Sequence, residues 1–105
     1  MIGLISINHK TASLSRREQF ALGEEEAVQL ISQWQGEQDL LGGFVLSTCN
    51  RLEIYYEAPN QVTQELESTL IRSLYRFKRI RHSGEESIFT TLPHTEAIRH
   101  LLRLA

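Results

Sequence analysis

Apolar and polar residues follow one another in short blocks, and three of these blocks have the character of β-strands. Residues 2–7 are rich in β-branched side chains, and residues 43–46 form a continuous apolar run that predicts a buried strand. Residues 52–56 alternate in polarity, which predicts a half-exposed strand with successive side chains on opposite faces. The two expected faces carry Leu52, Ile54 and Tyr56 on one side and Arg51, Glu53, Tyr55 and Glu57 on the other.

Two helices are predicted between the first and second strands. Ser15 followed by Glu18 fits a capping box, so a short helix is expected over residues 15–22. Glu24 opens the second helix, where negative charge is favourable, and Gly36 can close it. The apolar face of this second helix consists of Ala27, Leu30, Ile31 and Trp34.

The second half of the chain predicts a long helix, a strand and a last helix. The long helix opens at Pro59 and Asn60, has a buried side of apolar residues at helical spacing, and is broken at Ser83-Gly84. Residues 87–92 predict a fourth strand. The buried side of the long helix consists of Val62, Leu66, Leu70, Ile71, Leu74 and Phe77.

The last helix is predicted to begin with Thr95 as its N-cap. No glycine, asparagine or proline closes it, so we expect the chain to be a piece of a longer protein. Its apolar stripe consists of Ile98, Leu101, Leu102 and Ala105.

The order of elements is β-α-β-β-α-β plus a C-terminal helix, and it predicts an α+β fold. This order suits a ferredoxin-like split βαβ sandwich, with one antiparallel sheet and helices packed on one face. The crossovers between parallel strands should be right-handed. A fold of this kind does not define an activity.

Composition limits the possibilities to one soluble domain. The chain has 105 residues, of which 41% are hydrophobic, enough for one modest core. The net charge of -2 is too small to indicate a general nucleic-acid-binding or membrane-binding surface. No apolar run approaches the roughly 20 residues that span a bilayer, and no signal peptide is visible. One cysteine cannot form an internal disulfide, so we expect a cytoplasmic, reducing location.

The single cysteine, Cys49, lies in the predicted turn between the second and third strands, next to Asn50 and Arg51. A thiol at a sheet edge beside a guanidinium can be exposed and ionise easily, as a reactive thiolate requires. A lone cysteine in a small domain is more often a small buried hydrophobe. Its position alone leaves both interpretations open.

Four histidines are candidates for a base. His9 ends the first strand and approaches Cys49 if the hairpin turn lies at the same end of the sheet. From position alone, we expect His82 to be solvated, His94 to have a capping or loop role, and His100 to be partly buried and structural. One cysteine and scattered histidines match no zinc-ligand spacing, and no glycine-rich nucleotide-binding motif is present. Neither a metal site nor a cofactor site is therefore predicted within this chain.

Five of the eleven basic residues cluster at the end of the long helix. A solvated helix face explains them, although such a patch can also contact a phosphate backbone. The aromatic interleaving of single-strand binders is missing. The cluster consists of Arg72, Arg76, Lys78, Arg79 and Arg81.

Two motifs in this order and spacing resemble the N-terminal catalytic domain of glutamyl-tRNA reductase. The first is Ile-Asn-His-Lys-Thr-Ala at residues 7–12, and the second is Leu-Ser-Thr-Cys-Asn-Arg at residues 46–51. Residues 97–105 are similar to the segment that leads into the family's next motif. The resemblance covers nearly the whole chain, and it also includes Arg17, Glu18, Glu53 and Tyr55.

The resemblance implies a reaction. Enzymes of this family reduce the glutamate ester of charged tRNA(Glu) with NADPH to glutamate-1-semialdehyde, the first committed step of tetrapyrrole synthesis by the five-carbon route. The cysteine that matches Cys49 attacks the ester and forms a thioester, which is a better hydride acceptor than an ester. The resemblance implies that Thr48, Cys49, Asn50 and Arg51 bind substrate and that His100 is a catalytic acid or base.

The resemblance also implies what lies outside this chain. Residues 1–105 would be an N-terminal catalytic domain fragment, inactive alone as a reductase, without the NADPH-binding domain or the dimerisation domain. Expected partners are charged tRNA(Glu), a second copy of the longer protein, and glutamate-1-semialdehyde aminomutase as recipient of the product. Ser13 stands where the family often has proline, which should change loop stiffness more than chemistry. The alternative is a non-enzymatic, ferredoxin-like RNA- or protein-binding module in which Cys49 is structural.

Overall fold

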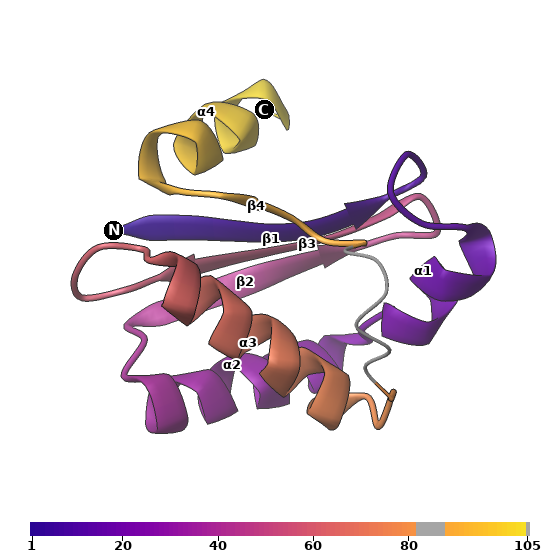
Figure 1. The fold of residues 1–105 in the computed structure, drawn as a ribbon, viewed down its shortest axis with the longest axis horizontal. Coiled ribbons are helices and arrows are strands. Elements are labelled where there is room, and N and C mark those ends of the chain that lie inside the picture. The colour runs from indigo at the N-terminus through magenta and orange to yellow at the C-terminus, as the bar shows by residue number, and fades with distance from the viewer. Residues whose placement is uncertain (82–87, 105) are drawn as a thin grey trace.

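The structure of the protein is a computed structural model that describes residues 1–81 and 88–104. It contains a four-stranded sheet and four helices (Figure 1). No helix within these two ranges is both long enough and apolar enough to cross a bilayer. In chain order the elements are β1 (Ile2–Asn8), α1 (Leu14–Phe20), α2 (Glu24–Gln38), β2 (Gly42–Ser47), β3 (Arg51–Glu57), α3 (Gln64–Phe77), β4 (Thr90–Leu92) and α4 (His94–Leu104).

The sheet is antiparallel throughout and has the strand order β2-β3-β1-β4. Helices α2 and α3 cover one face, with α1 at the end of the same layer, whereas α4 lies across the opposite face (Figure 1). This arrangement confirms the predicted α+β split βαβ fold of ferredoxin-like type. It also places the additional C-terminal helix on the face that the other helices leave open.

The register of the central strands determines which loops meet. Asn8 at the end of β1 pairs with Arg51 at the start of β3, because the two strands are antiparallel neighbours. The loop that follows β1 and the turn that precedes β3 therefore lie at the same end of the sheet, where the strands stop (Figure 1). This was the condition under which the sequence placed His9 near Cys49.

The main core lies between the sheet and the three helices α1, α2 and α3. Trp34 is fully buried there and donates a hydrogen bond from its indole Nε1 to Ser73 Oγ at 2.9 Å, which links α2 to α3. A smaller cluster on the other face joins Leu4 and Tyr55 of the sheet to Ala97 of α4. The sheet is thus buried on both faces along its central strands.

The burial predicted for the two hairpin strands was wrong in both cases. The apolar strand β2 is an edge strand in which Phe44 is 45% exposed, whereas the alternating strand β3 is buried from Leu52 to Tyr56. The reason is topological, because β3 lies in the middle of the sheet between two helical layers while α4 leaves the outer strand uncovered. The faces predicted for alternate β3 residues are confirmed.

Several helix ends differ from the prediction because a different residue supplies the cap. Ser13, not Ser15, caps α1 by accepting a hydrogen bond from the Arg16 N–H. Helix α2 continues past Gly36 to Gln38, where Asp39 adopts the left-handed conformation that ends it.

The bounds of α3, β4 and α4 also differ from those predicted. Thr63 caps α3, so this helix begins after the predicted start at Pro59 and Asn60. Helix α4 begins at His94, one residue before the predicted cap Thr95, and buries Ala97 while Leu102 is 69% exposed. Strand β4 covers only the second half of the predicted 87–92. The predicted break at Ser83-Gly84 and His82 lie outside the described residues, as does Ala105 of the predicted stripe.

Candidate functional site

The turn that carries Cys49 is held by its own backbone and by one hydroxyl. The Thr48 N–H donates to the Arg51 carbonyl oxygen at 2.9 Å, which closes the hairpin. The Thr48 Oγ1 accepts from the N–H groups of Asn50 and Arg51 at 3.2 and 3.3 Å. A short hydroxyl side chain at the start of a turn favours this arrangement. The thiol of Cys49 is consequently presented at the tip of a turn with fixed geometry, and it is exposed.

Arg17 on α1 ties this turn to the loop that follows β1. Its Nε donates to the Cys49 carbonyl oxygen at 3.2 Å, and its Nη1 donates to the Ala12 carbonyl oxygen at 2.8 Å. The loop itself is ordered by Asn8, whose Oδ1 accepts from the Lys10 N–H at 2.8 Å. The start of α1, the Cys49 turn and the loop after β1 are therefore held together at one end of the sheet.

A cleft of about 540 Å³ opens at this end of the sheet, on the face that carries α4. Its walls come from the end of β1, the start of β3 and the middle of α4. Cys49 itself is not among the residues that line it, although the next two residues along the chain are. The lining residues are Asn8, His9, Lys10, Asn50, Arg51, Glu53 and His100.

Apart from Asn8, whose side chain orders the loop, the polar side chains of the cleft fall into two classes. Among the described residues, the His9 ring, the Lys10 ammonium, the Asn50 amide and the Arg51 guanidinium make no side-chain hydrogen bond or ion pair. These groups are free to contact a ligand, and two of them are cationic. The cleft therefore suits an anionic group such as a carboxylate, which a guanidinium binds with two parallel hydrogen bonds.

The other class is a pair, Glu53 and His100. The Glu53 Oε2 lies 2.6 Å from the His100 Nε2, and the glutamate side chain is only 4% exposed against 33% for the histidine. Within the described residues, the second glutamate oxygen and the Tyr55 hydroxyl are buried and make no well-formed hydrogen bond, although the two side chains are near enough for Glu53 to act on the Tyr55 hydroxyl. Burial, and then the neighbouring Glu53 charge, raise the pKa of Tyr55 to about 12.

The structure separates the histidines that the sequence left as alternatives. His9 and His100 both line the cleft, from β1 and α4. The His94 Nδ1 accepts a hydrogen bond from the Ile2 N–H at 3.0 Å, at the other end of β1, about 20 Å from Asn8 along the strand. The predicted linker position of His94 is therefore wrong, because this residue begins α4, and its ring binds the start of β1 instead of lining the cleft.

The four predicted substrate-binding residues occupy different places. Asn50 and Arg51 line the cleft, Cys49 lies beside it at the tip of the turn, and Thr48 uses its hydroxyl to hold the turn. All four residues are exposed.

The basic cluster at the end of α3 does not belong to this cleft. Helix α3 covers the opposite face of the sheet. Lys78 is not a free cation, because its Nζ lies 3.0 Å from Glu26 Oε2 and donates to the Ala21 carbonyl oxygen at 2.8 Å. The remaining members of the cluster are exposed arginines: Arg72, Arg76, Arg79 and Arg81.

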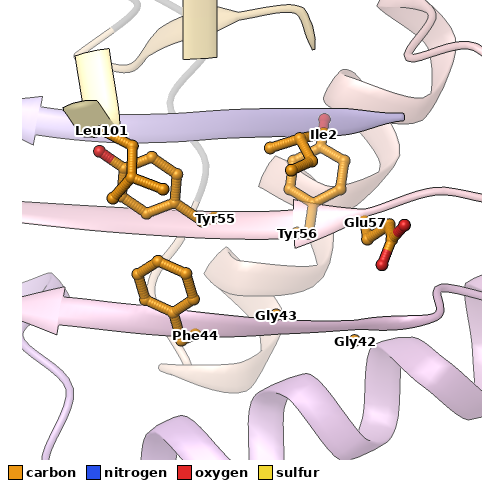
Figure 2. Close-up of a pocket in the computed structure, with 8 residues that line it drawn as sticks. All are labelled: Ile2, Gly42, Gly43, Phe44, Tyr55, Tyr56, Glu57 and Leu101. Carbon is orange, nitrogen blue, oxygen red and sulfur yellow. The ribbon is translucent and has the colours of Figure 1, made fainter. Parts of the chain in front are cut away.

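A second, smaller cleft of about 210 Å³ lies farther along the α4 face (Figure 2). The Phe44 ring stacks on the Tyr55 ring with centroids 4.9 Å apart, and Leu101 of α4 covers the other side of Tyr55. Its lining is mainly apolar and includes neither a thiol nor a histidine. It therefore lacks the groups that acyl transfer needs.

Two residues that are prominent in the structure of the site, Glu53 and Arg17, were assigned no role from the sequence. Glu53 was expected on an exposed strand face, yet it is buried against α4. Arg17 entered only through the family resemblance, yet it links the Cys49 turn to the loop after β1. Glu53 could have been noticed in the sequence if β3 had been expected to be covered on both faces, because a charged side chain is rarely buried in such a strand.

The described residues contain neither a cluster of metal ligands nor the parallel sheet of a dinucleotide-binding domain. Within the two described ranges, no three histidine, cysteine or carboxylate side chains come together as metal ligands. No glycine lines the larger cleft to let a backbone approach a pyrophosphate, and the sheet is antiparallel rather than the parallel sheet of dinucleotide-binding domains. We therefore assign no residue of this chain to NADPH.

Comparison with known proteins agrees with the motifs of the turn and the loop. Residues 5–105 match the family model described as "Glutamyl-tRNAGlu reductase, N-terminal domain". A protein named glutamyl-tRNA reductase from Pasteurella multocida (strain Pm70) is 34% identical over 105 residues, an alignment that covers 97% of this chain and 24% of that protein. The chain thus spans about a quarter of the length of this relative. The chain belongs to the family of glutamyl-tRNA reductase N-terminal domains.

Proposed function

We propose that this chain is the catalytic domain of a glutamyl-tRNA reductase and that Cys49 accepts the glutamyl group of charged tRNA as a thioester. The observation that carries the proposal is that Cys49 is exposed on a fixed turn and that the next two residues, Asn50 and Arg51, line a cleft in which the Arg51 guanidinium makes no ion pair with a described residue. Membership of the family supports the same reaction.

The acyl transfer follows from ordinary thiol chemistry. The Cys49 sulfur attacks the ester carbonyl carbon, a carbon–sulfur bond forms, and the bond from that carbon to the ribose oxygen breaks. The thiol proton passes through an imidazole to the departing ribose oxygen. His100 is our choice for this imidazole because of the family resemblance, and His9, which lines the same cleft, is the alternative.

Arg51 would select glutamate. Its guanidinium can bind the side-chain carboxylate through two hydrogen bonds, whereas the neutral amide of glutamine offers only one acceptor oxygen. Asn50 lines the same cleft and would bind a further polar group of the aminoacyl ester. Thr48 would contribute indirectly, by holding the turn on which Cys49 is presented.

The remaining steps would take place in the longer protein. We infer that NADPH, bound by a domain outside this chain, reduces the thioester to glutamate-1-semialdehyde. We further infer a homodimer, transfer of the product to glutamate-1-semialdehyde aminomutase, and a cytoplasmic location. A reducing compartment is consistent with a free, exposed Cys49.

The test is intact-mass analysis of the longer protein after mixing with glutamyl-tRNA in the absence of NADPH. We expect a covalent glutamyl adduct in the unmodified protein and none in Cys49→Ser. Arg51→Lys should form the adduct at least about tenfold more slowly, because a lysine cannot form the bidentate pair. Arg72→Lys, an exposed change on α3, serves as the matched control.

Two outcomes would oppose the proposal. An adduct of undiminished yield in Cys49→Ser would reject Cys49 as the nucleophile. The absence of any adduct in the unmodified protein would favour the alternative of a binding module.

A further inference from the structure

Glu53 is a buried acid in a place where packing alone would favour an apolar side chain. It lies in the central strand β3 and is 3% exposed, and the next residue on its face, Tyr55, belongs to the apolar cluster beneath α4. Removing a carboxylate from water costs several kcal/mol unless close partners compensate for the lost hydration. A buried charge with a specific partner in a cleft is therefore a candidate for a functional role.

Its close partner across to α4 is His100. Oε2 lies 2.6 Å from the His100 Nε2, within hydrogen-bond distance and at the short limit for a bond between nitrogen and oxygen. The tautomer decides which group donates: with an ionised carboxylate, which can only accept, the proton of this bond is on Nε2. The other ring nitrogen, Nδ1, makes no hydrogen bond to any described residue.

We propose that Glu53 is a positioning residue that holds the His100 ring in the cleft with Nε2 protonated, so that Nδ1 is the nitrogen that exchanges protons with the reacting groups. This inference rests on the proposed function. A carboxylate on one ring nitrogen fixes both the orientation of the ring and the identity of the free nitrogen.

The hydrogen bond to Glu53 joins His100 of α4 to strand β3. Glu53 lies two residues after Arg51 on the same face of the strand, so both side chains point toward α4. One strand thus presents the proposed carboxylate-binding group and the anchor of the proposed base. A rotation or shift of α4 would move His100 out of reach unless this bond is retained.

The first test is the His100 imidazole N–H signal in the proton NMR spectrum of the chain itself, which requires no substrate. We expect a resolved, downfield Nε2–H resonance, since a hydrogen bond to a carboxylate slows exchange of this proton with water. It should disappear in His100→Ala and Glu53→Ala and persist at a changed shift in Glu53→Gln, whose amide oxygen still accepts. Glu57→Gln, an exposed change on the same strand face, should leave the resonance unaltered.

The second test is the rate of glutamyl adduct formation in the longer protein. We expect Glu53→Ala to slow the reaction about 10- to 100-fold, within the contribution typical of a positioned acid or base. Glu53→Gln should recover most of this loss. In the double variant with His100→Ala, the Glu53→Ala change should cause little further loss, because a residue that acts only through another adds nothing once that residue is gone.

The outcomes separate the two proposals. A His100 signal that is indifferent to Glu53→Ala, or losses that multiply in the double variant, would overturn the positioning role. If no variant and no parent protein forms the adduct, the proposed function fails, while the NMR result still decides whether Glu53 holds His100.

Discussion

Replacing Arg17 with alanine removes the two hydrogen bonds that hold the Cys49 turn against α1. One joins Nη1 to the Ala12 carbonyl oxygen at 2.8 Å in a partly buried position, and the other joins Nε to the Cys49 carbonyl oxygen at 3.2 Å in an exposed one. Hydrogen bonds from a charged donor contribute about 1.5–3 kcal/mol when buried. Because water competes for the exposed bond, we count mainly the first and expect a loss of about 2 kcal/mol.

Urea unfolding measures this loss of free energy directly, and thermal unfolding provides a second measure. For a domain of this size, a loss of about 2 kcal/mol corresponds to a fall in melting temperature of roughly 8 °C or more. Amide exchange should show a larger local effect, because the N–H groups in the Cys49 turn lose the anchor on α1. Arg72→Ala is the matched control, since it removes an exposed arginine whose side chain, among the described residues, bonds only to Thr69 Oγ1 at 3.3 Å.

Equal unfolding free energies for Arg17→Ala and Arg72→Ala would refute this reasoning. So would unchanged amide exchange across residues 48–51. Either result would mean that the hairpin holds the thiol in place without α1.

Two further predictions concern stability. The raised pKa of Tyr55, about 12 against an ordinary 10.0, means that from about pH 10 the unfolded chain releases this proton while the folded protein retains it, so stability should fall as pH rises toward 12. Tyr55→Phe should flatten this decline by roughly 1–2 kcal/mol in urea titrations, and an equally steep decline in the variant would contradict the assignment. Ser73→Ala should cost about 1–3 kcal/mol, because it leaves the buried Trp34 N–H without its acceptor, whereas Ser68→Ala, exposed on the same helix, should cost little. Equal unfolding midpoints for the two serine variants would count against the first estimate.

The order of elements was predictable because each element depends on local pattern. Alternation along residues 51–57 gave both faces of β3 correctly, since the period of a strand is fixed by backbone geometry. Burial was not predictable in the same way. Whether Phe44 or Tyr55 is covered depends on which strand lies at the edge of the sheet and on where α4 packs, and neither is encoded locally.

The candidate site was likewise predictable only in part. The sequence placed His9 near the hairpin turn only on the condition that both lie at one end of the sheet, and the antiparallel pairing of β1 with β3 meets that condition. The pairing of Glu53 with His100 joins residues 47 positions apart through the packing of a helix on a sheet. Residue pattern alone could not reveal that contact.

The central claim is that the Cys49 sulfur receives the glutamyl group. The most direct measurement is acid quenching of the longer protein with glutamyl-tRNA, followed by digestion and tandem mass spectrometry of the modified peptide. The account predicts a glutamyl group on the peptide that contains Cys49, with fragment ions that place it on the sulfur. A glutamyl group located on another residue, with Cys49 recovered as the free thiol, would contradict it.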